Sequence, residues 1–319
     1  MNPHDDAMVY SEGTAHRIEW NELPPLVRNE IERRLGAKVC TANSQRGGFS
    51  HGMAARLELD DGVRVFAKAI SDDDGLAPMY HAEADTAARL PRRVPAPSVL
   101  CTIETAGWFI TVFEDIEGHH PRLDQPNDLV AVLAMVEQLA DVLTPSPLVG
   151  GATIAEDYGP KLMCWRQFAE HTPPADLDDW SLRNLDRLAA LESTWPEAAA
   201  GETLLHTDLR PDNMLLRPDG TVVAVDWAWP CRGAAWVDLV SLAPSIAASG
   251  LDPDPILAAH PVTRGTDPAA IDAFVCALVG YWEHNSRRSA PPRSPKLRGY
   301  QAHSALVSRE WLSRRLTWS

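Results

Sequence analysis

The sequence predicts an α+β fold in which a sheet of antiparallel strands comes first and a helical part follows. Before residue 115 the chain shows about five strand-like runs and one inserted helix, whereas helical periodicity dominates beyond residue 120. A length of 319 residues, 45% of them apolar, suffices for one large domain or two lobes with a real core. We place the division after residue 115, between an N-terminal nucleotide-binding lobe, 1–115, and a helical C-terminal lobe, 116–319, that carries the acceptor site.

The N-terminal part opens with a helix that Gly36 ends. Its second and third strands flank Asp60, Asp61 and Gly62, a strong hairpin signal. A helix follows the third strand, and three prolines after it open an extended segment. The expected helices are 24–35 and 78–90, and the expected strands are 38–43, 53–59, 63–70, 99–102 and 108–113.

The C-terminal part is expected to consist mainly of helices. Between the third and fourth of them lie two short apolar runs, 203–205 and 222–225, that read as strands. The expected helices are 128–143, 160–170, 178–191, 236–248, 268–287 and 295–316.

Composition and charge exclude several classes of protein. No run of eighteen or more apolar residues occurs, and residues 1–10 are polar and acidic, so we expect a soluble cytoplasmic protein. A net charge of −15 argues against nucleic acid or an anionic membrane as a partner and permits a cationic substrate. The cysteines are far apart with no CxxC pair, which favours free thiols. The sequence contains no repeat or coiled coil, and it leaves the oligomeric state open.

The most informative stretch runs from 204 to 230. It contains His206 and Asp208, then Asn213 five residues later, and then Asp226 at the end of a valine-rich strand. Phosphoryl transfer needs a carboxylate that takes the proton of the attacking hydroxyl, and an amide oxygen with a second carboxylate to hold Mg²⁺. The spacing therefore favours a phosphotransfer site over an ordinary polar turn.

A second constellation lies upstream. Lys68 stands in an otherwise apolar strand, in a chain that has only four lysines against twenty-five arginines. Fifteen residues later, Glu83 falls in the helix expected at 78–90. A strand lysine that holds the phosphates and is itself held by a helix glutamate is the kinase arrangement. Glu58 and Asp85 are other carboxylates close by in the sequence.

A glycine-rich turn separates the first two strands. Backbone amides at Gly47 and Gly48 could bind phosphates there, with the Ser50 hydroxyl added. The same turn also spells G-x-S-x-G, the nucleophile elbow of serine hydrolases, with Ser50 as nucleophile. Only 47 residues precede this stretch, and a strand rather than a helix is expected after it, which disfavours the hydrolase alternative.

In this order, the three constellations resemble the aminoglycoside phosphotransferase family, which is related to choline kinases and more distantly to protein kinases. The resemblance covers roughly residues 38–285 and implies a bilobal protein-kinase-like fold. It rests on GGFSHG at 47–52, VFAKA at 65–69, the Glu83 helix, VFEDIEG at 112–118, HTDLRPDN at 206–213 and VDWAWPCRGAAWVDL at 225–239.

The resemblance implies a role for each matching residue. Asp208 would be the catalytic base, Asn213 and Asp226 the Mg²⁺ ligands, and Lys68 the phosphate clamp. The backbone of Glu114, Asp115 and Ile116 would bind adenine, and two roles are open for Arg210, contact with the γ-phosphate or capping of the loop.

The sequence also departs from its relatives. Gly233 is followed by two alanines where the family often has Asp-Pro, so the retained Asp238 is expected to be structural. Asp226 is followed by Trp227 and Ala228, and no Ala-Pro-Glu occurs, which disfavours a protein substrate. Candidate acceptor-binding residues, where carboxylates beside aromatic rings would suit a cation, are Trp227, Trp229, Asp252, Asp254, Tyr281, Trp282, Glu283 and His284.

The sequence therefore predicts an enzyme that uses ATP and Mg²⁺ to phosphorylate a hydroxyl of a small molecule. Aminoglycosides or other antibiotics, amino-sugars, sugars and nucleosides are all open as acceptors. A nucleotide-binding regulator without turnover and the Ser50 hydrolase are the alternatives.

Overall fold

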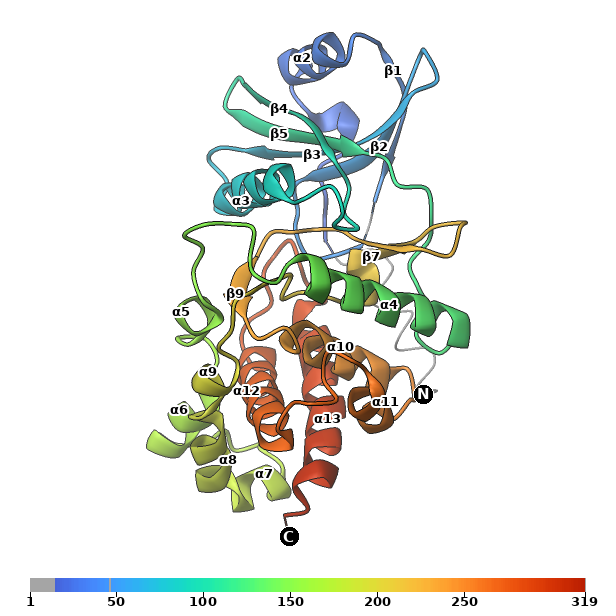
Figure 1. Cartoon of the computed structure of the whole chain (residues 1–319). Coiled ribbons are helices and arrows are strands. Elements are labelled where there is room, and N and C mark those ends of the chain that lie inside the picture. Colours follow the sequence, from blue (N-terminus) through green and yellow to red (C-terminus); the bar gives the residue numbers. More distant parts are fainter. Residues whose placement is uncertain (1–14, 46, 319) are drawn as a thin grey trace. The chain divides into compact units, whose positions relative to one another are not determined.

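The computed structural model describes residues 15–45 and 47–318, and these form two compact units (Figure 1). The predicted character of residues 1–10 lies outside the described residues. The division after residue 115 stays a prediction, because neither compact unit is continuous in sequence. Unit 1 comprises Met1–Pro121, Pro211–Trp229 and Pro291–Lys296, and unit 2 comprises Arg122–Arg210, Pro230–Ala290 and Leu297–Ser319.

Unit 1 is built on one antiparallel sheet with the strand order β1-β2-β3-β5-β4. Gly62 has a positive φ of 84° in the turn between β2 and β3, as the predicted hairpin requires. The α+β fold predicted from the sequence is confirmed, and each strand lies within three residues of its expected bounds. The strands are β1 (Val39–Ser44), β2 (Met53–Leu59), β3 (Arg64–Ser71), β4 (Val99–Thr105) and β5 (Trp108–Glu114).

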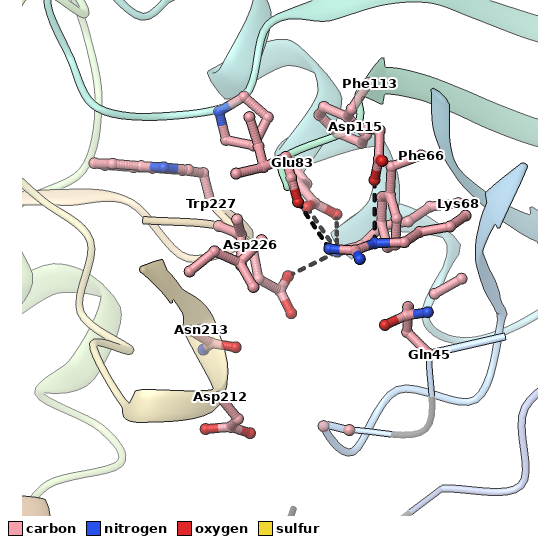
Figure 2. Close-up of a pocket in the computed structure, with 18 of the residues that line it drawn as sticks. Gln45, Phe66, Lys68, Glu83, Phe113, Asp115, Asp212, Asn213, Asp226 and Trp227 are labelled. Atoms are coloured by element: carbon pink, nitrogen blue, oxygen red, sulfur yellow. Dashed lines mark hydrogen bonds and ion pairs between the residues drawn. The ribbon is translucent and has the colours of Figure 1, made fainter. Parts of the chain in front are cut away.

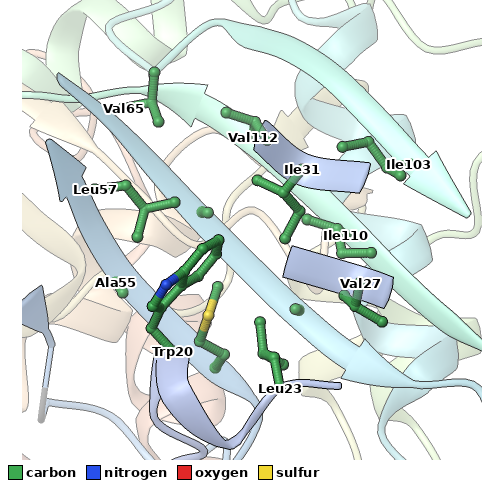
Figure 3. Close-up of a cluster of buried hydrophobic side chains, with 13 residues drawn as sticks. Trp20, Leu23, Val27, Ile31, Ala55, Leu57, Val65, Ile103, Ile110 and Val112 are labelled. Atoms are coloured by element: carbon green, nitrogen blue, oxygen red, sulfur yellow. The ribbon is translucent and has the colours of Figure 1, made fainter. Parts of the chain in front are cut away.

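One face of this sheet is covered by the helices η1 (Trp20–Glu22) and α2 (Pro25–Leu35). Val27 and Ile31 of α2 are fully buried, and they belong to one apolar cluster with the sheet residues Val65 and Ala67 (Figure 3). Because side chains alternate along a strand, the odd-numbered residues of β3 face this cluster. Lys68 therefore points to the other face of the sheet.

The other face carries α3 (Ala77–Arg89), which was expected at 78–90. Tyr80 and Ala84 of this helix pack against Ile70 of β3 and Phe109 of β5. Ile70 lies two residues from Lys68 on the same face of β3. The fold of unit 1 thus brings the strand lysine to the helix that bears Glu83.

Two later segments complete unit 1. Pro211–Trp229 forms η2 (Pro211–Asn213) and a hairpin of β7 (Met214–Leu216) and β8 (Val222–Ala224). This hairpin is joined to the earlier chain by a bridge between Leu216 and His119 and by the bond from the Ala224 N–H to the Pro95 carbonyl.

Unit 2 is mainly helical, and α12 packs along α13. The helix expected at 178–191 is two helices, because the chain breaks at Asn184, whose side chain donates to the Trp180 carbonyl. No helix in the described part of the chain is long and apolar enough to cross a membrane. The helices are α4 (Pro126–Val142), α5 (Ile154–Tyr158), α6 (Cys164–Glu170), α7 (Asp179–Arg183), α8 (Leu185–Glu192), α9 (Trp195–Ala198), α10 (Val237–Ala248), α11 (Pro253–Ala259), α12 (Pro268–Ser286) and α13 (Leu297–Leu316), with short strands β6 (Thr203–Leu205) and β9 (Cys231–Gly233).

Candidate active site

A buried ion pair joins β3 to α3. The Lys68 Nζ lies 2.7 and 2.8 Å from the two carboxylate oxygens of Glu83, and the residues are only 9% and 5% exposed. Both predicted partners are therefore in direct contact, whereas the other nearby carboxylates, Glu58 and Asp85, bond to Thr41 and Arg89 at the surface. A buried lysine is held this firmly only where its charge is paired.

Lys68 has a second carboxylate partner within unit 1. Its Nζ lies 3.1 Å from Oδ1 of Asp226 (Figure 2). Burial alone would lower the pKa of Lys68, but the charges of Asp226 and Glu83 outweigh burial and raise the pKa above its ordinary value. Burial raises the pKa of Glu83, an effect that the Lys68 charge opposes. Lys68 thus pairs with two carboxylates at once.

The backbone at Asp226 is strained. Asp226 follows β8 and has a φ of 68°, in the left-handed region that non-glycine residues rarely occupy. The neighbouring backbone is fixed on both sides, because the Val225 N–H donates to the Asn213 carbonyl and the Trp227 Nε1 donates to the Ala224 carbonyl. Strain that the surroundings maintain at a polar residue is typical of a functional site.

These side chains line a cavity of about 240 Å³ whose walls all belong to unit 1 (Figure 2). The predicted site residues among its walls are Gly47, Gly48, Lys68, Glu83, Glu114, Asp115, Ile116, Asn213 and Asp226. Sequence reasoning missed other lining residues, notably Arg17, Gln45, Arg56, Phe66, Asp212 and Phe113. Phe66 and Arg56 could have been found from the strand period, because Phe66 lies two residues before Lys68 and pairs with Arg56 across the sheet.

The segment after β5 is held by two arginines. Asp115, whose side chain is 3% exposed, lies 3.1 Å from Arg56 Nε and 3.5 Å from Arg64 Nε. Arg56 also donates to the Ile116 carbonyl, whereas the Ile116 N–H has no acceptor among the described residues. The side chain of Glu114 faces Arg217 of the β7–β8 hairpin. The Ile116 N–H is thus a backbone donor at the cavity wall that a ligand could use.

The glycine turn runs from β1 directly into β2. A nucleophile elbow requires a strand followed by a helix, so the turn gives no support to the hydrolase alternative. Ser50 is not among the cavity walls, and its hydroxyl accepts a hydrogen bond from Arg17.

Asp208 belongs to unit 2, where a buried carboxylate shapes the loop that precedes it. The two oxygens of Asp238 accept the N–H groups of His206 and Thr207, each at 2.8 Å. Thr207 has a φ of 66°, and its hydroxyl lies 2.8 Å from that of Tyr158. Burial raises the pKa of Asp238, while His206 and the two backbone bonds oppose the rise. Asp238 therefore has the structural position expected from the sequence.

Asp208 itself is partly exposed. Its N–H donates to Nδ1 of the fully buried His206, at 3.3 Å. Its Oδ1 lies 3.7 Å from Arg210 Nε, and the Arg210 guanidinium stands 5.2 Å from the centre of the Tyr300 ring. Arg210 therefore contacts the carboxylate that the sequence singles out as a base.

Comparison with known proteins identifies the family. A profile described as the phosphotransferase enzyme family (APH) matches residues 46–274. The chain belongs to this family. The match confirms the resemblance drawn from the motifs, and a comparison with curated protein sequences finds no match.

Similar solved structures show the same kinase-like α+β fold. A thermostable mutant of the aminoglycoside phosphotransferase APH(4)-Ia, in complex with ADP and hygromycin B, is 14% identical with a TM-score of 0.59, over 91% of this chain and 98% of that one. The choline kinase LicA from Streptococcus pneumoniae is 14% identical with a TM-score of 0.60, over 90% and 98%. A choline/ethanolamine kinase family protein from Mesorhizobium loti is 13% identical with a TM-score of 0.59, over 91% and 97%.

In this member of the family, the carboxylates singled out for a cationic acceptor have structural partners within unit 2. Asp252 caps α11 by accepting the Asp254 N–H. Asp254 binds Arg315 and the Trp311 Nε1. Glu283 is only 3% exposed and is bonded to two arginines, Arg287 and Arg309.

The oxygen donors of the candidate site suit a hard cation that is bound only in part by the protein. Asn213 and Asp226 supply an amide oxygen and a carboxylate at one wall of the cavity, and Asp212 lies beside them (Figure 2). The described residues contain no cluster of three or more His, Cys, Asp or Glu side chains that could hold a metal. Magnesium in nucleotide sites is characteristically bound by one or two protein side chains together with phosphates and water.

Proposed function

We propose that this protein is an ATP-dependent phosphotransferase that moves the γ-phosphate onto a hydroxyl of a small molecule. The observation that carries the proposal is Lys68, held by Glu83 and Asp226 in a cavity that the glycine turn also lines. The proposal agrees with the family of the chain, and ADP in a structure with the same fold supports the choice of nucleotide.

On the nucleotide side, each proposed role follows from a contact. The Ile116 N–H would donate to adenine, because the Ile116 carbonyl is taken by Arg56. Lys68 would bind phosphate oxygens while Glu83 keeps it in place. Asn213 and Asp226 would hold Mg²⁺, which supplies positive charge next to the transferred phosphate. The excess of carboxylates around Lys68 leaves Asp226 with negative charge for that cation.

On the acceptor side, Asp208 would take the proton of the attacking hydroxyl. The hydroxyl oxygen then forms a bond to the γ-phosphorus, the bond from that phosphorus to the β–γ bridging oxygen breaks, and ADP leaves with the bond electrons. Asp238 contributes by fixing the backbone of His206 and Thr207, so that the following carboxylate has one orientation. Arg210, close to Asp208, would bind the transferred phosphate.

The proposed acceptor is an antibiotic such as an aminoglycoside, an amino-sugar or a sugar. The contacts of unit 2 favour acceptors whose binding does not depend on a carboxylate of the protein, because Asp254 and Glu283 already pair with arginines. Among the described residues, no carboxylate lies within ion-pair distance of Arg288, which follows α12, or of Arg298, in the first turn of α13. Acceptors that carry a carboxylate or phosphate therefore belong beside the cationic ones in a screen.

The test is ADP release in the presence of Mg·ATP across aminoglycosides, amino-sugars, neutral sugars and sugar acids. We expect Asp208→Asn to lower turnover about 10²- to 10⁴-fold with the best acceptor, because general-base catalysis is lost, while nucleotide affinity stays unchanged. Asp73→Asn, at an exposed position of unit 1, is the matched control. Nucleotide binding without ADP release for any acceptor would overturn the proposal in favour of a non-catalytic regulator.

A further inference from the structure

Arg17 lines the same cavity as Lys68, although it lies far before the glycine turn in sequence. Its guanidinium donates to the Ser50 hydroxyl at 3.3 Å and to the Gly47 carbonyl. The residue precedes the first residue of the family match, at 46, so no family motif contains it.

Arg17 differs in its ion pairing from the other cations that line the cavity. The other two cations of the cavity walls are ion-paired, Lys68 with Glu83 and Arg56 with Asp115. Arg17, in contrast, has no carboxylate within ion-pair distance among the described residues, and its Nε is buried without an acceptor. A buried guanidinium nitrogen without a hydrogen bond is costly unless a ligand satisfies it.

The charge of Arg17 also acts on Glu83, the ion-pair partner of Lys68. Burial raises the pKa of Glu83 and of Tyr80, and Arg17 is among the charges that oppose both rises. Arg17 and Lys68 thus act on the same carboxylate. Both cations also line the one cavity, so a polyanion bound there would face both of them.

The backbone around Arg17 holds this position. The Ile18 N–H donates to the His51 carbonyl, so the segment runs beside the glycine turn. Gly48 has a φ of 77°, and a Cβ there would lie 3.2 Å from an Arg17 guanidinium nitrogen. Ser294 supports the turn independently, through a bond from its hydroxyl to the Phe49 carbonyl. A glycine at 48 leaves room for the guanidinium beside the turn.

We propose that Arg17 is a second phosphate-binding cation of the nucleotide site, which donates from its guanidinium to the polyphosphate of the bound nucleotide. The inference rests on the proposed function and extends it to a segment outside the family match. Its ligand is the polyphosphate alone, so adenosine gains nothing from this residue.

The test compares the affinities of the full chain for ATP, ADP and adenosine by calorimetry, in the wild type and in Arg17→Gln. We expect ATP affinity to fall about tenfold to a hundredfold, because a hydrogen bond between charged groups is lost. Adenosine affinity should stay within about twofold. Arg17→Lys keeps the charge and should recover part of the ATP affinity. Arg33→Gln, at an exposed position of α2, is the matched control.

Ser294→Ala separates phosphate binding from mere support of the turn, because it removes a support of the turn and leaves the charge. If Ser294→Ala weakens ATP binding as much as Arg17→Gln does, or if Arg17→Gln leaves ATP affinity unchanged, the inference is wrong while the proposed function stands. A wild-type chain that binds no nucleotide would contradict the proposed function and the inference together.

Discussion

The two units use buried charge differently. In unit 1, the buried charges of Lys68 and Glu83 pair with each other, and Lys68 also contacts Asp226 at the cavity wall. In unit 2, the buried carboxylates of Asp238 and Glu192 each accept two backbone N–H groups.

This difference shows which buried charges are able to exchange partners. A carboxylate bonded to backbone amides keeps its partners as long as the local fold persists. A lysine between two carboxylates can give up one of them to a phosphate and still be held by the other. In unit 1 the exchange would leave Glu83 on Lys68 and free Asp226 for a cation. In unit 2, the carboxylates of Asp238 and Glu192 instead hold backbone segments in place, including the left-handed residue Thr207.

The largest effect, on activity, is expected at Lys68, which pairs with two carboxylates. Lys68→Met should lower kcat/KM for Mg·ATP about 10²- to 10³-fold, because a positioned donor to the phosphates is lost. Lys38→Met, at an exposed lysine paired with Glu32, should change kcat/KM less than twofold. Steady-state kinetics of ADP release measure both. Equal kcat/KM for wild type and Lys68→Met would show that the pair in unit 1 is as structural as the carboxylates of unit 2.

A smaller effect, on stability, is expected at the fixed carboxylate. Asp238→Asn keeps one acceptor oxygen but turns an NH₂ group toward the second backbone N–H. The free energy of unfolding should fall by about 1–3 kcal/mol, the cost of one buried polar group without a partner. Urea denaturation measures this, with Asp186→Asn at an exposed position of α8 as control. If Asp238→Asn loses no more stability than the control, Asp238 does not stabilise the fold through its backbone bonds.

A third effect, a change of stability with pH, is expected at Glu192. Burial raises its pKa from 4.5 to about 7, although the N–H groups of Trp165 and Arg166 oppose the rise. Between pH 4.5 and 7 the folded chain therefore keeps a proton that the unfolded chain has released. Stability at this site is greatest below this window and declines as pH rises through it, by at most about 1.4 kcal/mol per pH unit.

Glu192→Gln removes this ionisation. We expect the variant to be less stable at low pH, since an amide replaces one acceptor oxygen, but to lose less stability than the wild type between pH 5 and 7. Thermal unfolding at several pH values measures the two slopes, and Glu197→Gln at an exposed position serves as control. If melting temperature falls equally with pH in wild type and Glu192→Gln, the pH dependence comes from a group other than Glu192.

The sequence predicted those parts of the site that follow from chemistry at fixed spacing. Lys68, Glu83 and Asp226 are the residue types expected for phosphoryl transfer, and the structure brings all three into contact. The strand and helix periodicity predicted the elements that carry the first two. The sheet was predictable for a similar reason, because alternation and the Asp-Asp-Gly turn determine its second and third strands.

The features that the sequence did not predict depend on contacts between residues distant in sequence, or on single side-chain bonds. Arg17 has no motif, and only the path of the chain beside the glycine turn brings it to the cavity. Asp254 and Glu283 were suggested as acceptor carboxylates because a single sequence does not reveal their arginine partners, which lie just after α12 and on α13. The break at Asn184 depends on a side-chain bond that competes with the helix.

The cover of the sheet by η1 and α2 has a consequence for protein production. A chain shortened to the family limits, 46–274, would lack both helices, strand β1 and all of α13. The face of the sheet that holds Leu57, Val65 and Val112, each at most 2% exposed, would then meet water, and β2 would become an unprotected edge. Such a fragment should precipitate, so expression limits for this protein have to follow its packing rather than the extent of sequence similarity.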